Sequence, residues 1–184
     1  MKRLPIGSRF FYFNKKNKKN IYKMGESGYN VGTSGRKGGV TMFFIGTYNH
    51  SLDEKNRVTM PSKLRDKLGA TVYITLGLDK CLAIYPEDTF IQIASNLSRA
   101  SSLQNDNRGY KRTFYANSYE CDVDKQGRIQ LSKELCEKCS VKKDVVVIGV
   151  DDHVEIWDRQ QYNEMSEIND GKYEENAQRI SYGE

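Results

Sequence analysis

Two short segments of this sequence carry the same pair of charged residues at the same spacing. Asp53 and Arg57 are separated by three residues, and Asp124 and Arg128 repeat that spacing 71 positions later. An Asp at the start of a turn can accept hydrogen bonds from backbone N–H groups two or three residues on, and the following Arg can pair with it. One interpretation is therefore purely structural: each pair stabilises its own turn.

Each turn also contains side chains that could contact nucleic acid. The polar donors are Lys55, Asn56 and Arg57 in the first turn and Lys125, Gln126 and Arg128 in the second. Arg, Asn and Gln present paired groups that match the edges of DNA bases, whereas Lys suits phosphate. Because these donors occur in both copies, the repetition favours a binding function over the purely structural interpretation.

The repetition extends well beyond the turns. Residues 52–60 match residues 123–131, and residues 75–85 match residues 147–157, where the second copy has gained one residue. A repeat of this length predicts two equivalent structural units. In each unit, alternation and turn signals predict the order strand, strand, short helix, strand, strand. We expect the first two strands of each unit to form a hairpin with the Asp-x-x-x-Arg turn at its bend.

Helices are predicted within and after these units. Pro61 suits the first turn of a short helix in the first copy, and Ser132 is a suitable N-cap in the second. Longer helices are predicted by hydrophobic spacing over residues 86–97, 106–116 and 159–168. The middle one is expected to pack Tyr110, Phe114 and Tyr115 inward. A polar tail follows the last helix.

Composition indicates a globular chain with an uneven charge distribution. Of 184 residues, 38% are hydrophobic and 29% are charged, so two small halves are expected to share one core. No apolar run has the length needed to span a bilayer. Residues 1–41 contain ten Lys or Arg and one acid, whereas residues 42–184 contain nineteen bases and twenty-three acids. Any DNA affinity of the body must therefore come from a local basic cluster.

Residues 1–41 are expected to be a disordered basic extension. Our hypothesis is that the natural protein begins at Met42, because Lys37-Gly38-Gly39 can be encoded by a sequence resembling a ribosome-binding site just upstream. The alternative is a basic tail that binds nucleic acid nonspecifically. An intact peptide spanning residues 36–43 in the mass spectrum of the native protein would exclude the start at Met42.

Catalytic and metal-binding chemistry has little support. Cys136-x-x-Cys139 is a lone CxxC, whereas a zinc ribbon needs a second pair, so reduced thiols in helical core positions are the simpler interpretation. His50 and His153 show no recognisable triad spacing, which leaves only a triad assembled in space as an alternative. Glycine-rich residues 32–39 lack the strand, Lys-Ser/Thr ending and helix of a phosphate-binding loop. We expect no catalytic residue, no cofactor and no metal.

Five motifs together resemble a known family. They lie at residues 42–46, 52–61, 77–82, 121–128 and 154–157. In order and separation they resemble the MraZ family of bacterial transcriptional regulators, over residues 42 to about 165. The resemblance also supports Met42 as the start, because the family begins there.

The resemblance implies a mixed α+β, β-rich fold. This would be a double-split β-barrel like that of AbrB-type regulators, in which two tandem ββαββ repeats form an intrachain pseudo-dimer with peripheral helices. The expected divisions are 42–97 for the first repeat and its helix, 98–116 for a linker and helix, 117–170 for the second repeat and its helix, and 171–184 for the polar tail. Family members assemble into rings of several subunits.

The implied function is sequence-specific binding to double-stranded DNA. The targets would be direct repeats in the promoter of the division and cell-wall gene cluster, with Arg57 and Arg128 contacting DNA while Asp53 and Asp124 stabilise the turns. We expect a cytoplasmic, nucleoid-associated ring-like homo-oligomer with no membrane partner and no small-molecule substrate. Because Cys136 stands where the first repeat has Arg65, the first turn is expected to matter more. The alternative is an oligomeric protein-binding scaffold with incidental nucleic-acid affinity.

Overall fold

The structure, a computed structural model, describes residues 3–6, 9–12 and 43–182. The chain divides into two compact units, Met1–Thr41 and Met42–Glu184. In the first unit, β1 (Arg3–Ile6) and β2 (Arg9–Tyr12) form a two-stranded antiparallel sheet. The expected disorder of this extension otherwise concerns residues outside the described ranges and stays a prediction.

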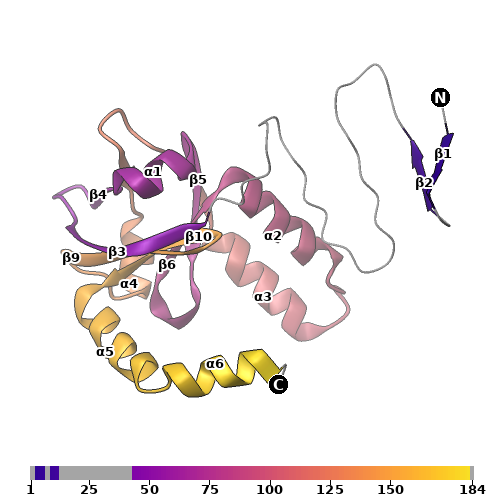
Figure 1. The fold of residues 1–184 in the computed structure, drawn as a ribbon. Coiled ribbons are helices and arrows are strands. Elements are labelled where there is room, and N and C mark those ends of the chain that lie inside the picture. The colour runs from indigo at the N-terminus through magenta and orange to yellow at the C-terminus, as the bar shows by residue number, and fades with distance from the viewer. Residues whose placement is uncertain (1–2, 7–8, 13–42, 183–184) are drawn as a thin grey trace. The chain divides into compact units, whose positions relative to one another are not determined.

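The second unit combines eight strands with helices (Figure 1). Its strands are β3 (Phe44–Ser51), β4 (Arg57–Thr59), β5 (Thr71–Leu76), β6 (Leu82–Pro86), β7 (Tyr119–Asp122), β8 (Arg128–Gln130), β9 (Asp144–Asp151) and β10 (His153–Asp158). Its α-helices are α1 (Ser62–Leu68), α2 (Glu87–Arg99), α3 (Asn105–Ala116), α4 (Lys133–Lys138), α5 (Arg159–Asp170) and α6 (Tyr173–Tyr182). The turn between β5 and β6 holds the 3-10 helix η1 (Leu78–Lys80). Each repeat therefore has the predicted order of elements.

The strand order is symmetric with respect to the two repeats. Six strands form an antiparallel sheet in the order β3-β9-β10-β6-β5-β7, and β4 pairs with β8 in a separate two-stranded sheet. From either edge inward, the order is the first strand of one repeat, followed by the third and fourth strands of the other repeat. The outer strand on each side comes from the opposite repeat, so the two repeats are interleaved.

Two strand pairs lie on the axis of this symmetry. In the β4–β8 ribbon, Val58 pairs with its own counterpart, Ile129. In the main sheet, Ala83 of β6 likewise pairs with its counterpart Glu155 of β10. Val58 and Ile129 are both fully buried. The core is thus built across the repeats, and a single cluster of buried residues contains side chains from both, as expected for halves too small to fold alone.

The expected hairpins are wrong. β3 pairs with β9 along its whole length, from Phe44 opposite Asp151 to Ser51 opposite Asp144. β4 pairs with β8 instead, so the Asp53 turn carries the chain from one sheet into the other. Alternation specifies which face of a strand is buried, but it does not specify the neighbouring strand, and here that neighbour comes from the other repeat.

The pairing also changes the alignment of the repeats by one residue. Tyr48 of β3 lies opposite Val147, and its counterpart Tyr119 of β7 lies opposite Ile74. Ile74 is therefore the structural counterpart of Val147, where the sequence match had placed Thr75. Ile74 and Val147 are both fully buried. The difference arises because the turn between β9 and β10 is tighter than the turn between β5 and β6.

Helices cover the flanks of the sheet. Figure 1 shows α2 and α3 side by side, and stacking links them to the sheet: the ring of Phe90 lies 4.3 Å from Tyr73 and 5.7 Å from Phe114. Phe114 is buried as predicted. The prediction that Tyr110 and Tyr115 also pack inward is wrong, because their side chains are 51% and 44% exposed. Their rings instead lie beside that of Phe114, with ring centroids 6.1 Å and 5.4 Å from it. No described helix combines the length and apolar character needed to cross a bilayer.

The C-terminal segment also departs from the simple picture of a tail. α6 occupies most of the residues that were expected to form it, and the part of its surface that is described is exposed throughout. The run of exposed side chains explains why the segment reads as polar in sequence. A helix there has few tertiary contacts to define it.

Candidate nucleic-acid interface

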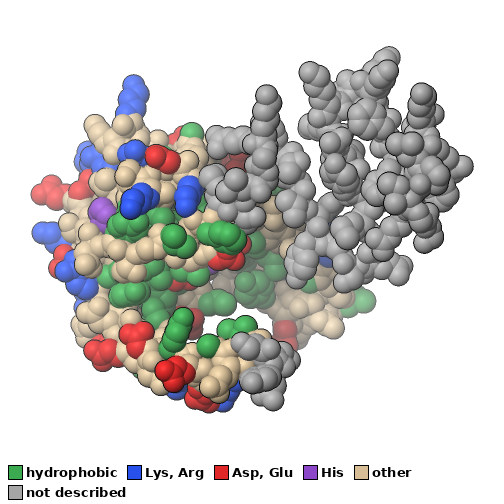
Figure 2. Space-filling view, viewed as in Figure 1, with side chains coloured by type: hydrophobic (Ala, Val, Ile, Leu, Met, Phe, Trp, Pro, Cys, Tyr) green, Lys and Arg blue, Asp and Glu red, His purple; other side chains and the backbone are tan. Residues whose placement is uncertain are grey.

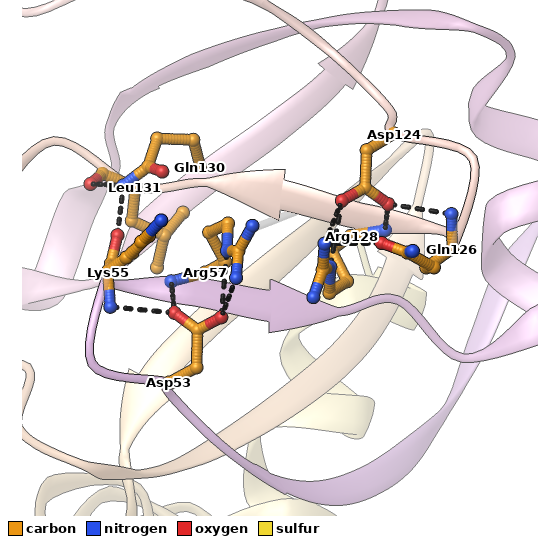
Figure 3. A network of polar contacts seen from close by, with 8 residues as sticks. All are labelled: Asp53, Lys55, Arg57, Asp124, Gln126, Arg128, Gln130 and Leu131. Atoms are coloured by element: carbon orange, nitrogen blue, oxygen red, sulfur yellow. Dashed lines mark hydrogen bonds and ion pairs between the residues drawn. The ribbon is translucent and has the colours of Figure 1, made fainter.

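The first Asp-x-x-x-Arg turn is held by one carboxylate. Asp53 Oδ1 accepts hydrogen bonds from the backbone N–H groups of Lys55 and Arg57, each at 2.9 Å. Its Oδ2 accepts from Arg57 Nε at 2.7 Å and lies 2.7 Å from Nη2 (Figure 3). Paired contacts of a guanidinium with a carboxylate are strong and directional. The Arg57 side chain is consequently fixed against its own turn.

The second turn repeats this geometry closely. Asp124 Oδ1 accepts from the N–H groups of Gln126 at 2.8 Å and Arg128 at 2.9 Å, and Oδ2 contacts Arg128 Nε and Nη2 at 2.7 Å each. The Gln126 side-chain oxygen also accepts from Arg128 Nη2. The arginine side chains remain about one quarter exposed, at 27% for Arg57 and 26% for Arg128. The structural role of both Asp residues and the accessibility of both Arg residues therefore coexist.

Backbone conformation explains the residue types at the fourth turn position. Asn56 has φ 55° and Gly127 has φ 75°, a region that Asn and Gly tolerate best. The backbone carbonyl of each residue also accepts a hydrogen bond from the other repeat: Leu131 N donates to Asn56 O at 2.9 Å, and Met60 N donates to Gly127 O at 2.8 Å. The two turns are thus tied to opposite ends of the β4–β8 ribbon.

The ribbon presents one polar face. Val58 and Ile129 point into the core, so their neighbours in each strand point outward. The outward residues are Arg57, Thr59, Arg128 and Gln130. Thr59 and Gln130 were missed by the sequence reasoning, although alternation around the two buried residues could have found them. Gln130 also donates to the Lys55 carbonyl across the ribbon, as Figure 3 shows.

The remaining candidates lie at the rims of the turns. Lys55, Lys125 and Gln126 are exposed, and Asn56 is half-buried. A shallow hollow of about 370 Å³ beside the first turn is lined partly by Asp53, Asn56 and, from the other repeat, Lys142 and Lys143. Figure 2 shows Lys and Arg gathered over the end of the unit that carries α1 and β4, with acids along α5. This local segregation allows an acidic body to present a basic surface.

The structure changes how the charge of α1 is assigned. Arg65 was expected to favour the first turn, but its side chain lies against Gly127 of the second turn, where an added Cβ would stand 2.8 Å from Arg65 Cδ. Its counterpart Cys136 is buried on α4. The sequence could not reveal this because the contact crosses between the repeats.

The carboxylate pKa values provide a test of the turn geometry. The side-chain hydrogen bond from Arg57, followed by its backbone hydrogen bond, lowers the pKa of Asp53 to about 2. The pKa of Asp124 is also lowered, most by the backbone hydrogen bond from Arg128 and next by its side-chain hydrogen bond. A lowered folded-state pKa stabilises the fold above the ordinary Asp value and loses that contribution as the pH falls through the folded value. NMR titration of the Asp53 carboxyl should show ionisation near pH 2, and Arg57→Ala should raise the midpoint. A wild-type midpoint near 4 would contradict this geometry.

The four cysteines are free thiols. Cys81, Cys136 and Cys139 are buried, and Cys139 Sγ donates to the Cys81 carbonyl at 3.1 Å. Burial raises the pKa of Cys139 to about 11 and raises those of Cys81, Cys136 and Cys121 as well. Within the described residues, no group of three or more His, Cys, Asp or Glu side chains is placed to hold a metal ion.

The thiolate is the reactive form of cysteine, so the buried thiols should react slowly. In the native protein at pH 8, we expect iodoacetamide to modify half-buried Cys121 first, with the other three protected until the protein unfolds. Peptide mapping over time measures the order. Rapid labelling of Cys81 or Cys139 in the folded protein would contradict this packing.

Comparison with known proteins identifies the family. The model of the MraZ protein family, which is described as antitoxin-like, matches residues 43–113 and 114–181. A relative from Finegoldia magna is 38% identical over 134 residues, covering 73% of this chain and 94% of the relative. One from Caldanaerobacter subterraneus is 40% identical over 136 residues, covering 74% and 95%. One from Mesoplasma florum is 38% identical over 143 residues, covering 77% and 98%.

These three relatives carry the same name, transcriptional regulator MraZ, and the two family matches fall on the two structural repeats. The chain therefore belongs to the MraZ family of transcriptional regulators.

Proposed function

We propose that this protein regulates transcription by binding specific DNA sequences with the β4–β8 ribbon and its two flanking turns. The observation that carries the proposal is the pair of Asp-held guanidinium groups, Arg57 and Arg128, on the outward face of one ribbon. A two-stranded ribbon fits the major groove, where every base pair presents a distinct pattern of donors and acceptors. Gln130 pairs with Arg57 across the ribbon and Thr59 pairs with Arg128, and both add further polar groups to that face.

The two Asp carboxylates order the arginine side chains without occupying all of their N–H donors, so Arg57 and Arg128 can still bind DNA. Asp53 occupies Nε and Nη2 of Arg57, and Asp124 does the same for Arg128. Among the described residues, no group forms a hydrogen bond with Nη1 of Arg57 or of Arg128. A side chain that is already ordered loses less entropy on binding. Each turn therefore offers a fixed donor to a base or phosphate, with Lys55 or Lys125 beside it for the phosphate backbone.

The proposed target is a set of direct repeats in the promoter of the division and cell-wall gene cluster. In this proposal the unit is a double-split β-barrel whose two repeats act as a pseudo-dimer, and several chains form a ring in the cytoplasm, associated with the nucleoid. A ring would place many turns along one rim, so that each subunit adds phosphate contacts without a large net charge. The symmetric strand order and the interleaved repeats support the pseudo-dimer.

The alternative proposal is an oligomeric scaffold in which the same turns contact neighbouring subunits. A gel-shift titration on the protein's own upstream promoter, repeated at rising salt concentration, separates the two. A regulator should prefer the promoter repeats over random DNA of equal length and lose affinity steeply with salt. Equal affinity for both sequences would favour the scaffold.

A further inference from the structure

Arg65 forms a second guanidinium at the second turn. It belongs to α1 of the first repeat, yet its side chain lies over buried Gly127. A Cβ added to Gly127 would lie 2.6 Å from Arg65 Nη1 and 2.8 Å from Cδ. The absence of a side chain at Gly127 therefore leaves room for that of Arg65.

The guanidinium of Arg65 is the least constrained of the three near the ribbon. Among the described residues, its ion pair is a single contact of Nη2 with Asp66 Oδ1 at 3.4 Å, and its side chain is 39% exposed. Arg57 and Arg128 instead have Nε and Nη2 held at 2.7 Å. Reading guanine requires two N–H groups on one edge of the guanidinium. Arg65 can supply such an edge without breaking a strong ion pair.

The first turn has no equivalent of this arrangement. The counterpart of Arg65 is Cys136, which is buried, and the counterpart of Gly127 is Asn56, which carries its own polar side chain. An amide matches adenine, whereas a guanidinium matches guanine. The pseudo-symmetry is therefore broken at the positions that could read bases, with Asn56 in one turn and Arg65 in the other.

We propose that Arg65 is a specificity-determining residue of the second turn and contacts a guanine edge, so that the two turns of one chain recognise different bases. This inference rests on the DNA-binding function proposed above. Arg65 belongs to the first repeat, but its side chain lies at the Asp124 turn of the second repeat. This specificity therefore depends on the interleaving of the two repeats.

The test compares Arg65→Ala with Lys67→Ala in the full chain, using duplexes of the upstream promoter and of random sequence. Lys67 is a matched control because it lies on the same helix and its Nζ donates to the Phe43 carbonyl at 2.5 Å. Arg65→Ala should weaken promoter binding about tenfold more than Lys67→Ala does, with equal effects on random DNA. In duplexes substituted at each position of the repeat, it should abolish the preference at one G·C pair.

A second variant keeps the arginine but displaces it. Gly127→Asn tolerates the positive φ and should reproduce the loss caused by Arg65→Ala, while adding no further loss in the Arg65→Ala background. A full additional loss there would contradict displacement of Arg65 as the cause. If Arg65→Ala matched Lys67→Ala on every duplex while Arg57→Ala lost promoter binding, the inference about Arg65 would fail and the proposed function would stand. Wild-type binding by both Arg65→Ala and Arg57→Ala would contradict the inference about Arg65 and the proposed function together.

Discussion

Replacing Arg57 by Ala is expected to weaken binding to the promoter repeats by about 1–3 kcal/mol per lost base contact, while the protein stays folded. The turn retains two backbone hydrogen bonds to Asp53 Oδ1, from Lys55 and from residue 57 itself, each at 2.9 Å. The lost ion pair is partly exposed, and such pairs contribute roughly 0–1 kcal/mol to stability. Binding should therefore fall far more than stability does.

Fluorescence anisotropy with labelled promoter DNA gives the affinity, and thermal melting of the same samples gives the stability. Arg57→Lys is the informative companion, because Lys keeps the charge but cannot make the paired contact. It should fall between the wild type and Arg57→Ala. Wild-type affinity for Arg57→Ala would remove this residue from the DNA interface, and an unfolded variant would assign it to the turn alone.

The largest effect on stability is expected for Ile129→Ala. Ile129 is fully buried and pairs with Val58 on the axis between the repeats. Removing a buried Ile side chain costs about 2–5 kcal/mol, because contacts are lost and a cavity remains. Since the core is shared, both repeats should unfold together in one transition at lower denaturant concentration.

Chemical denaturation followed by circular dichroism measures this change. Ile45→Ala is the matched control, because Ile45 is 68% exposed and its truncation should change the free energy of unfolding by no more than about 0.5 kcal/mol. Two separate transitions in Ile129→Ala, or equal effects of the two variants, would contradict a core built across the repeats.

The local structure of the chain was largely predictable from its sequence. Alternation located the strands, and Pro61 and Ser132 marked the starts of α1 and α4. The Asp53 and Asp124 turns also have the hydrogen bonds expected of Asp at the start of a turn. These features depend on residues close together in sequence, where physical preferences act directly.

Features that depend on the other repeat could not be obtained in this way. Periodicity identifies the buried face of β4 but not its partner β8, so the hairpin expectation was wrong. The position of Arg65 over Gly127 likewise depends on interleaving. Tyr110 shows the same limit on a helix: spacing placed it near the face of Phe114, but spacing does not specify how much of that face other elements cover, and Tyr110 is 51% exposed.

The central claim is that two Asp-held guanidinium groups on one ribbon recognise DNA. The most direct test is the affinity of the Arg57→Ala, Arg128→Ala double variant for promoter repeats and for a shuffled duplex at one salt concentration. Arg179→Ala is the control. Arg179 likewise pairs with an acid four residues earlier, with Nη2 2.6 Å from Glu175 Oε1, but it lies on α6 and not on the ribbon. We predict that the double variant binds both duplexes equally weakly, while Arg179→Ala retains the wild-type preference for the repeats. A folded double variant that still prefers the promoter repeats would contradict the account.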